Sequence, residues 1–482
     1  MLANKTRISR RLRQSIWRNT LLAHRWVGIS VGIVVLMWCI SGVVMMYVQY
    51  PELKPVEQLA ALQSLSSVQC CNGELPSSIS AAMSGPYMLE VLSGKPVFRF
   101  QSTNRQLVLD IEAKQWIDSW PEEDLRTVGT DYALRQGWGV PEVVTRVERD
   151  QWTVQGRFDP HRPMLKFENP EGRSWYVSSS TAQIVQVTNR SERFWNWLGS
   201  VPHWLYPTVL RQHTAIWSQV VIWLTLISLF LTITGIIIGI KHFRWRSESE
   251  GSPYKGMMIW HHYAGLFFGL FTLTWVLSGL FSMNPWGLLE SRSFGVERNV
   301  LNGVDQTVSE IVDTIDAVLP NTPEGTVRLE SAYWLGEPYF LAWDAHGNAT
   351  RISADGDTST LSEADINRAL VELDLNEATA DKLVNEDPYY YGLHEDVRLP
   401  VWRILEQSGD RYYVSQETGQ LQVIVDRNAA SNRWLFRALH SLDFHAVVRF
   451  RPLWDLLMIL LLLGVITGVS TGTWLGLRRL IQ

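Results

Sequence analysis

Four histidines recur in two pairs along the chain, and imidazole nitrogen is a common axial ligand of haem iron. His24 and His261 are 237 residues apart, and so are His203 and His440. The same offset relates a group of small and aromatic residues around the first pair: Gly28, Gly32, Trp38, Ser41 and Gly42 correspond to Gly265, Gly269, Trp275, Ser278 and Gly279. The pattern indicates that one unit, with two possible metal-ligand positions, has been duplicated.

Four long apolar stretches must position these residues. They lie at roughly 26–48, 216–240, 258–283 and 453–477, and each is long enough to cross a bilayer as a helix. Two long polar segments separate them. We therefore expect a mainly α membrane protein with four transmembrane helices from a duplicated two-span unit and two exported α+β modules.

Lysine and arginine residues predict the orientation, because they concentrate on the cytoplasmic side of membrane proteins. They flank the apolar stretches at the N-terminus, in the link at 241–257 and at the C-terminus. We expect both termini in the cytoplasm and the protein in a bacterial inner membrane, with lipid and no nucleic acid among its partners. The expected segments are a basic N-terminus at 1–23, a span at 24–49, a module at 50–200, an approach segment and span at 201–240, a cytoplasmic loop at 241–257, a span at 258–283, a module at 284–433, an approach segment and span at 434–477, and a tail at 478–482.

The histidines fall at two levels of this membrane topology. His24 and His261 lie near the cytoplasmic ends of the first and third spans, whereas His203 and His440 precede the second and fourth spans near the outer face. A spanning helix separates these levels by roughly 30 Å. If the histidines bind haem, His24 must pair with His261, and His203 with His440. The sequence then predicts two haems, one at each side of the membrane.

Three other histidines are alternatives to these ligands. His262 competes with His261 but lies about 100° around the helix, so only one of the two can face the iron. His213 and His445 compete at the outer level, and neither has a histidine at the 237-residue offset. His213 and His445 are instead candidates to contact a ligand residue or to face the substrate. For any one of the four repeated histidines, the alternative to ligation is an imidazole at the membrane interface that hydrogen-bonds head groups.

Glycines and arginines near the histidines each allow two interpretations. Gly28, Gly32, Gly265 and Gly269 follow the histidines at helical spacing, where they would clear space for a flat macrocycle or allow close helix packing. The outer approach segments are rich in arginine, which would pair with haem propionates or an anionic ligand, or anchor the helices at head groups. These residues are Arg190, Arg193, Arg211, Arg427, Arg433, Arg437, Arg449 and Arg451.

The polar segments contain sequence patterns of strands and one helix. Ser174–Val177, Arg411–Val414 and Leu421–Val425 alternate as strands do, and 362–373 is typical of a helix with Ser362 as its N-cap. We find no Gly-rich dinucleotide motif, phosphate-binding loop or nucleophile elbow. The chain is therefore not expected to bind its own nicotinamide through such a motif.

Several short runs resemble one known family. They are His-Arg-Trp-Val-Gly at 24–28, Thr-Gly at 234–235, Leu-His-Ser at 439–441 and Tyr-Tyr-Val-Ser-x-x-Thr-Gly at 412–419. In order and spacing they are similar to the PepSY-associated transmembrane proteins over nearly the whole chain. The resemblance implies a ferric-siderophore reductase-like protein with two b-type haems, ligated by His24, His203, His261 and His440, and a periplasmic substrate. The first copy departs from the pattern, with Ser180–Thr181–Ala182 in place of Glu417–Thr418–Gly419, and with Pro202 rather than a leucine before His203.

We therefore expect an enzyme that takes electrons from a cytoplasmic donor or a membrane quinol and reduces a periplasmic ferric chelate or siderophore, in iron acquisition. One alternative is a di-haem electron-transfer protein for another periplasmic acceptor. A second is a non-enzymatic membrane protein whose exported modules bind or regulate a partner. A transporter is disfavoured because the apolar stretches hold almost no interior charge; Asp455 lies near an end.

Overall fold

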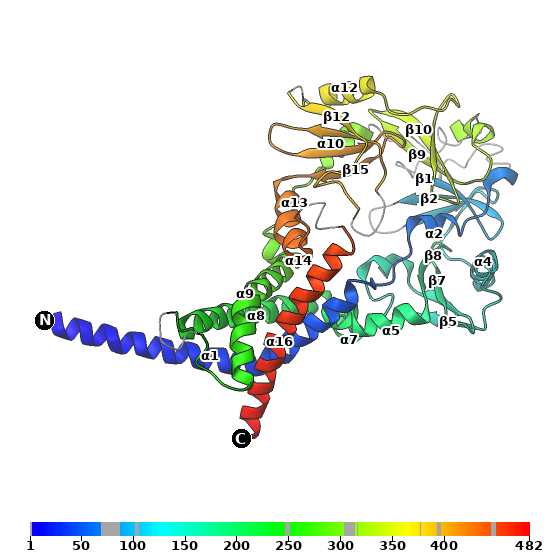
Figure 1. The fold of residues 1–482 in the computed structure, drawn as a ribbon. Coiled ribbons are helices and arrows are strands. Elements are labelled where there is room, and N and C mark those ends of the chain that lie inside the picture. The colour runs from blue at the N-terminus through cyan, green and yellow to red at the C-terminus, as the bar shows by residue number, and fades with distance from the viewer. Residues whose placement is uncertain are drawn as a thin grey trace. The chain divides into compact units, whose positions relative to one another are not determined.

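The computed structural model describes residues 2–68, 87–101, 106–245, 251–302, 314–315, 317–375, 377–392, 397–444 and 450–482. The chain divides into two compact units, each drawn in Figure 1. We call them the helical unit (Met1–Tyr50, Phe194–Glu290 and Asn428–Gln482) and the β unit (Pro51–Arg193 and Ser291–Arg427).

Four helices of the helical unit are long and apolar enough to cross a membrane, which confirms a multi-pass membrane protein. Their bounds are α1 Leu2–Met45, α8 Thr214–His242, α9 Met257–Ser282 and α16 Leu453–Ile481. Helix α1 begins at Leu2, so it includes both the expected basic N-terminus and the expected first span. Helix α1 continues through the basic N-terminal run because that run contains neither proline nor glycine before Gly28.

The four long helices form a closed bundle (Figure 1). Helix α1 packs against α8 and α16, and α9 packs against the same two helices. Helices α1 and α9 are therefore diagonal partners, and residues on their inner faces can meet at the centre of the bundle. This arrangement determines which histidines can approach one another.

Short helices precede α8 and α16. Before α8 lie α5 (Arg190–Leu198), α6 (Ser200–His203) and α7 (Thr208–Arg211); before α16 lie α13 (Arg427–Asn432), the π-helix η5 (Arg433–Ala438) and α14 (Leu439–Ser441). Helix α6 packs on α1, and α14 packs on α9. Helix α6 therefore brings His203 to α1, and helix α14 brings His440 to α9.

The β unit contains a seven-stranded antiparallel sheet to which both polar segments contribute. Its order is β11-β10-β9-β1-β2-β3-β4, with β1 paired to β9 through Leu89 and Leu329. The strands are β1 Tyr87–Leu92, β2 Lys95–Gln101, β3 Gln106–Asp110, β4 Gln115–Ile117, β9 Thr326–Trp334, β10 Glu337–Asp344 and β11 Ala349–Ser353. The two polar segments are thus joined by backbone hydrogen bonds within one sheet.

Each polar segment also forms a four-stranded antiparallel sheet of its own. These sheets are β5 Val143–Val147, β6 Met164–Glu168, β7 Ser174–Ser178 and β8 Ile184–Thr188, and β12 Thr379–Leu383, β13 Val401–Leu405, β14 Arg411–Ser415 and β15 Leu421–Val425. Strands β13 to β15 begin and end 237 residues after β6 to β8. The predicted strands at 174–177, 411–414 and 421–425 are confirmed.

The remaining helices of the β unit are short. The α-helices among the described residues of this unit are α2 Pro55–Leu59, α4 Glu122–Arg135, α10 Gly295–Asn302 and α12 Glu363–Glu372. The predicted N-cap of α12 is confirmed, because the Ser362 side chain accepts a hydrogen bond from the backbone N–H of Asp365. Helix α4 packs on β6 and β7, where the Trp175 indole donates to the carbonyl of Gly129 at 2.9 Å.

The turn that follows β7 matches the turn that follows β14 despite its different sequence. Ala182 adopts a φ of 54°, and Gly419, its counterpart, adopts 70°. In both turns the backbone N–H of the threonine donates to a serine hydroxyl, Thr181 to Ser178 and Thr418 to Ser415. The absence of glycine from the first copy therefore does not change the conformation of the turn.

Candidate functional site

The first histidine pair lies at the centre of the helical bundle. His24 of α1 and His261 of α9 have ring centroids 6.4 Å apart, with an angle of 38° between the ring planes. Nδ1 of His24 is 3.1 Å from the carbonyl oxygen of Leu231 on α8, and Nδ1 of His261 is 2.9 Å from that of Gly468 on α16. Each imidazole is thus held by a neighbouring helix that supplies a backbone acceptor.

The second pair has an equivalent arrangement near the C-terminal ends of α1 and α9. His203 of α6 and His440 of α14 have ring centroids 6.1 Å apart, with 75° between the ring planes. Nδ1 of His203 lies 3.1 Å from both the hydroxyl of Ser41 and the carbonyl oxygen of Trp38 on α1. Nδ1 of His440 lies 2.9 Å from the hydroxyl of Ser278 on α9.

These contacts determine which ring nitrogen is free to bind a metal. A carbonyl oxygen can only accept, so a ring whose Nδ1 contacts a carbonyl carries its proton there and keeps a lone pair on Nε2. His24, His203 and His261 meet this condition directly, and the backbone of Trp275 serves His440. Within the described part of the chain, Nε2 of none of the four makes a hydrogen bond. Histidine ligands of metals typically have this arrangement.

Burial favours the neutral form of the second pair, which is the form that binds metal. Burial lowers the pKa of His203 to about 4, with a hydrogen bond to the Trp38 backbone acting in the opposite direction. Burial also lowers the pKa of His440 to about 4, with a further contribution from His203. Both side chains therefore remain uncharged at neutral pH.

The three alternative histidines differ from these four. His262 is buried, and both of its ring nitrogens are engaged, Nδ1 with the Ser252 hydroxyl at 2.7 Å and Nε2 with the Gly239 carbonyl at 2.9 Å. His213 is exposed and precedes the first residue of α8. His445 lies outside the described residues.

The glycines singled out in the sequence have different surroundings. A Cβ atom on Gly28, Gly32 or Gly269 would meet a side chain of a neighbouring helix at 3.0–3.5 Å, which is typical of close helix packing. A Cβ atom on Gly265 would meet no described atom within 4 Å, and the same holds for Gly279. Gly265 is one turn beyond His261, so there is open space on the face of α9 that carries this histidine. At the second pair, a Cβ atom on Gly42, the counterpart of Gly279, would meet Cε1 of His203 at 3.5 Å.

Two other glycines are directly required by the histidines. A Cβ atom on Gly235 would lie 2.8 Å from Cε1 of His24, and one on Gly472 would lie 2.7 Å from Cε1 of His261. Ser41 and Ser278 hold the other pair. The 237-residue repeat contains all four residues, but only the structure shows that they contact the imidazoles.

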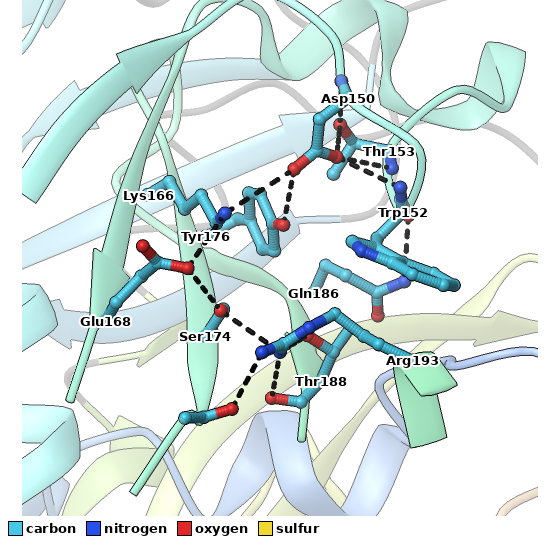
Figure 2. A network of polar contacts seen from close by, with 11 residues as sticks. Asp150, Trp152, Thr153, Lys166, Glu168, Ser174, Tyr176, Gln186, Thr188 and Arg193 are labelled. Carbon is cyan, nitrogen blue, oxygen red and sulfur yellow. Dashed lines mark hydrogen bonds and ion pairs between the residues drawn. The ribbon is translucent and has the colours of Figure 1, made fainter. Parts of the chain in front are cut away.

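Several arginines of the approach segments are engaged by protein groups. Arg193 donates to the hydroxyls of Ser174 and Thr188 and to the carbonyl of Gly172, within the polar network of Figure 2. The guanidinium of Arg211 stacks on Tyr206 and Trp217. Arg433 pairs with Asp443 at 3.2 Å, and Arg451 donates to the carbonyl of Met46. Arg449 lies outside the described residues.

The network of Figure 2 fixes the loop before β6. The hydroxyl of Tyr176 donates to Oδ2 of Asp150 at 2.6 Å, while Oδ1 accepts from the backbone N–H groups of Trp152 and Thr153. In the second four-stranded sheet the Tyr413 hydroxyl donates in the same way to Asp387, at 2.8 Å. These carboxylates are thus used to hold loops in both copies.

The two histidine pairs fit the axial ligation of haem. Two imidazoles that bind one metal ion from opposite sides, through metal–nitrogen bonds of about 2 Å, have ring centroids about 6 Å apart. Both pairs have this separation and a free Nε2 on each ring, and the first pair has open space beside Gly265. The described residues contain no cluster of three or more histidine, cysteine or acidic side chains suited to a bare metal ion.

Comparison with known proteins agrees with this architecture. No curated protein matches the chain. The family described as the PepSY-associated TM region matches residues 21–479. The match begins just before His24 in α1 and ends in the last turn of α16. The chain therefore belongs to the PepSY-associated transmembrane family.

Proposed function

We propose that this protein is a bacterial inner-membrane oxidoreductase that holds two b-type haems and carries electrons across the membrane to reduce a periplasmic ferric chelate, as ferric-siderophore reductases do. The observation that carries the proposal is the presence of two cross-bundle histidine pairs, each with ring centroids about 6 Å apart and unengaged Nε2 atoms. We also infer that the two pairs arose by internal duplication, since the serine contact of His203 and the carbonyl contact of His24 both recur 237 residues later, at His440 and His261.

The positions of the pairs suit transmembrane electron transfer. Along α1, His24 is separated from Trp38, whose carbonyl contacts His203, by 14 residues, or roughly 21 Å of helix. This distance is most of the ~30 Å hydrocarbon core. A haem held by each pair would supply one-electron redox chemistry at that level of the membrane.

The protein residues would have three tasks in this reaction. The four Nε2 atoms would ligate iron, the backbone carbonyls of Leu231, Trp38 and Gly468 would keep the imidazoles in the required tautomer, and the apolar helices would exclude water. Each electron delivered to the substrate converts Fe(III) to Fe(II), which oxygen-rich chelators hold less tightly. No proton donor or acceptor is required of the protein.

The orientation of the protein supports entry of electrons from the cytoplasm. On the side of the His24–His261 pair, basic residues precede His24 on α1, precede α9, and occupy the last turns of α8 and α16: Arg13, Arg18, Lys255, Lys241, Arg478 and Arg479. By the positive-inside rule this end faces the cytoplasm. The donor would be a cytoplasmic reductase or a membrane quinol, and the second pair would face the periplasmic ferric chelate.

Haem content tests the proposal. The purified full chain, expressed with ample haem, should give a reduced-minus-oxidised spectrum of b-type haem and a pyridine haemochrome count of two per chain. His24→Ala and His440→Ala should each retain one haem, whereas the control His213→Ala should retain two because His213 is exposed. A colourless wild-type protein would overturn the proposal and favour a non-enzymatic membrane protein that binds or regulates a partner.

A further inference from the structure

Two tryptophans with buried, unengaged indole N–H groups lie next to the second histidine pair. Nε1 of Trp38 on α1 and Nε1 of Trp275 on α9 are buried and have no hydrogen-bond partner among the described residues. The two residues are 237 positions apart, so the feature occurs in both halves of the chain. An indole N–H can only donate, and leaving a buried donor without an acceptor costs free energy.

Other tryptophans of the helical unit show that such donors are normally satisfied here. The Trp217 indole donates to the carbonyl of Trp204 at 2.8 Å, and that of Trp454 donates to the carbonyl of Ser441 at 2.7 Å. These two residues also correspond at the 237-residue offset. The repeat thus contains one tryptophan pair with protein acceptors and one pair without.

The positions of Trp38 and Trp275 indicate what could accept their hydrogen bonds. Trp38 precedes Ser41 by three residues, and Trp275 precedes Ser278 by three, which places each tryptophan on the helix face that holds a histidine. The backbone of Trp38 contacts His203 and that of Trp275 contacts His440, so the two tryptophans lie beside this histidine pair on the two diagonal helices.

On the basis of the proposed function, we propose that Trp38 and Trp275 donate hydrogen bonds to the two propionate carboxylates of the haem held by His203 and His440. The ionised carboxylates are the acceptors that a b-type haem offers, and there are two of them for two donors related by the repeat. Among the described basic residues of this region, Arg211 stacks on Trp217, Arg433 pairs with Asp443 and Arg451 donates to the carbonyl of Met46. The carboxylates would then lie toward the interior of the bundle.

The test uses Trp38→Phe and Trp275→Phe in the full-length, haem-loaded protein. Removing a donor leaves the carboxylate charge less compensated, which favours Fe(III). Each variant should therefore lower the midpoint potential of one haem, shift the propionate bending band in its resonance Raman spectrum and leave the other haem unchanged. The control Trp245→Phe, whose indole donates to the carbonyl of Ile240, should change neither haem.

A second measurement removes the acceptors instead of the donors. Wild-type and Trp38→Phe proteins reconstituted with haem dimethyl ester, which has no ionised carboxylate, should have the same midpoint potential. Unchanged potentials and propionate bands in haem-loaded Trp38→Phe and Trp275→Phe would overturn this inference alone. A wild-type protein without haem would overturn the proposed function as well.

Discussion

Gly235 of α8 lies directly against the imidazole of His24, so closely that a Cβ atom at this position would be 2.8 Å from Cε1 of the ring. Real Cβ contacts are longer, so any other residue must displace the imidazole or the helix. Gly472 has the same relationship to His261 on the opposite side of the bundle, at 2.7 Å. The two glycines therefore set how closely α8 and α16 approach the first histidine pair.

Gly235→Ala is expected to move His24 away from the bundle centre and to remove one haem per chain, since ligation tolerates little displacement of Nε2. Gly472→Ala should have the same effect through His261. The measurement is the pyridine haemochrome count of the purified variants. Gly28→Ala is the control, because its Cβ atom would meet Leu231 at an ordinary 3.5 Å, and it should retain two haems. Two haems in Gly235→Ala would show that the contact is not restrictive.

Gly265 provides a different test, because its Cβ atom would meet no described atom within 4 Å. Gly265→Leu should therefore fold normally in the absence of haem. If the open space beside His261 is the place of the macrocycle, this variant should lose one haem by steric exclusion. Haem titration of apoprotein, together with its thermal unfolding midpoint, separates exclusion from misfolding. An unchanged midpoint with two haems bound would place the macrocycle elsewhere.

Much of the architecture could be predicted because it follows from local patterns. The four spans follow from apolar length, the strands at 174–177 and 411–414 from alternation, and the cap at Ser362 from residue type. The pairing of β1 with β9 could not be predicted, because it joins residues such as Leu89 and Leu329 that are distant in the sequence and carry no pairing pattern.

The candidate site was only partly visible in the sequence for a similar reason. The repeat identified the histidines, and helical spacing connected Gly28 with His24, but no pattern assigned such a role to Gly235. Only the packing distinguishes Gly28, which contacts a leucine, from Gly235, which contacts an imidazole. The engagement of both nitrogens of His262 likewise depends on Gly239 and Ser252, whose positions result from tertiary structure.

The buried ion cluster of the seven-stranded sheet should be important for stability. Glu90 on β1 is fully buried and pairs with Arg99 on β2 and with Arg328 on β9, the latter at 2.6 Å. Arg99→Met should destabilise the protein by about 3–5 kcal/mol, because it leaves a buried carboxylate less compensated. The exposed pair between Arg126 and Glu122 is the control, and Arg126→Ala should cost less than about 0.5 kcal/mol.

The free energy of unfolding of Arg99→Met and Arg126→Ala is measured by chemical unfolding of the full chain in detergent. Circular dichroism in the wavelength range of β-structure follows the transition. The large effect is expected only for Arg99→Met, since its partner cannot be hydrated after the substitution. Equal unfolding midpoints for Arg99→Met and Arg126→Ala would contradict the assignment of Glu90 as a buried charge that links the two polar segments.

His161 of the β unit predicts a dependence of stability on pH. Burial lowers the pKa of His161 to about 4, with a smaller contribution from Arg99, and Nδ1 of the ring contacts the Ser178 hydroxyl at 3.1 Å. In the unfolded chain the pKa is about 6.5, so the unfolded state binds a proton first as the pH falls. Stability should therefore be complete above pH 6.5 and decrease toward pH 4, by up to about 3 kcal/mol.

His161→Gln removes this titration and retains a side chain that can hydrogen-bond Ser178. The free energy of unfolding of the wild type minus that of His161→Gln should decrease steadily as the pH is lowered from 7.5 to 4. His346→Gln is the control for replacing a histidine of the β unit, because the His346 side chain is exposed in the turn after β10. Because other buried acids affect all three proteins equally, only the difference curve reports on His161. A difference that is constant with pH would show that His161 can be protonated in the folded protein as readily as in the unfolded chain.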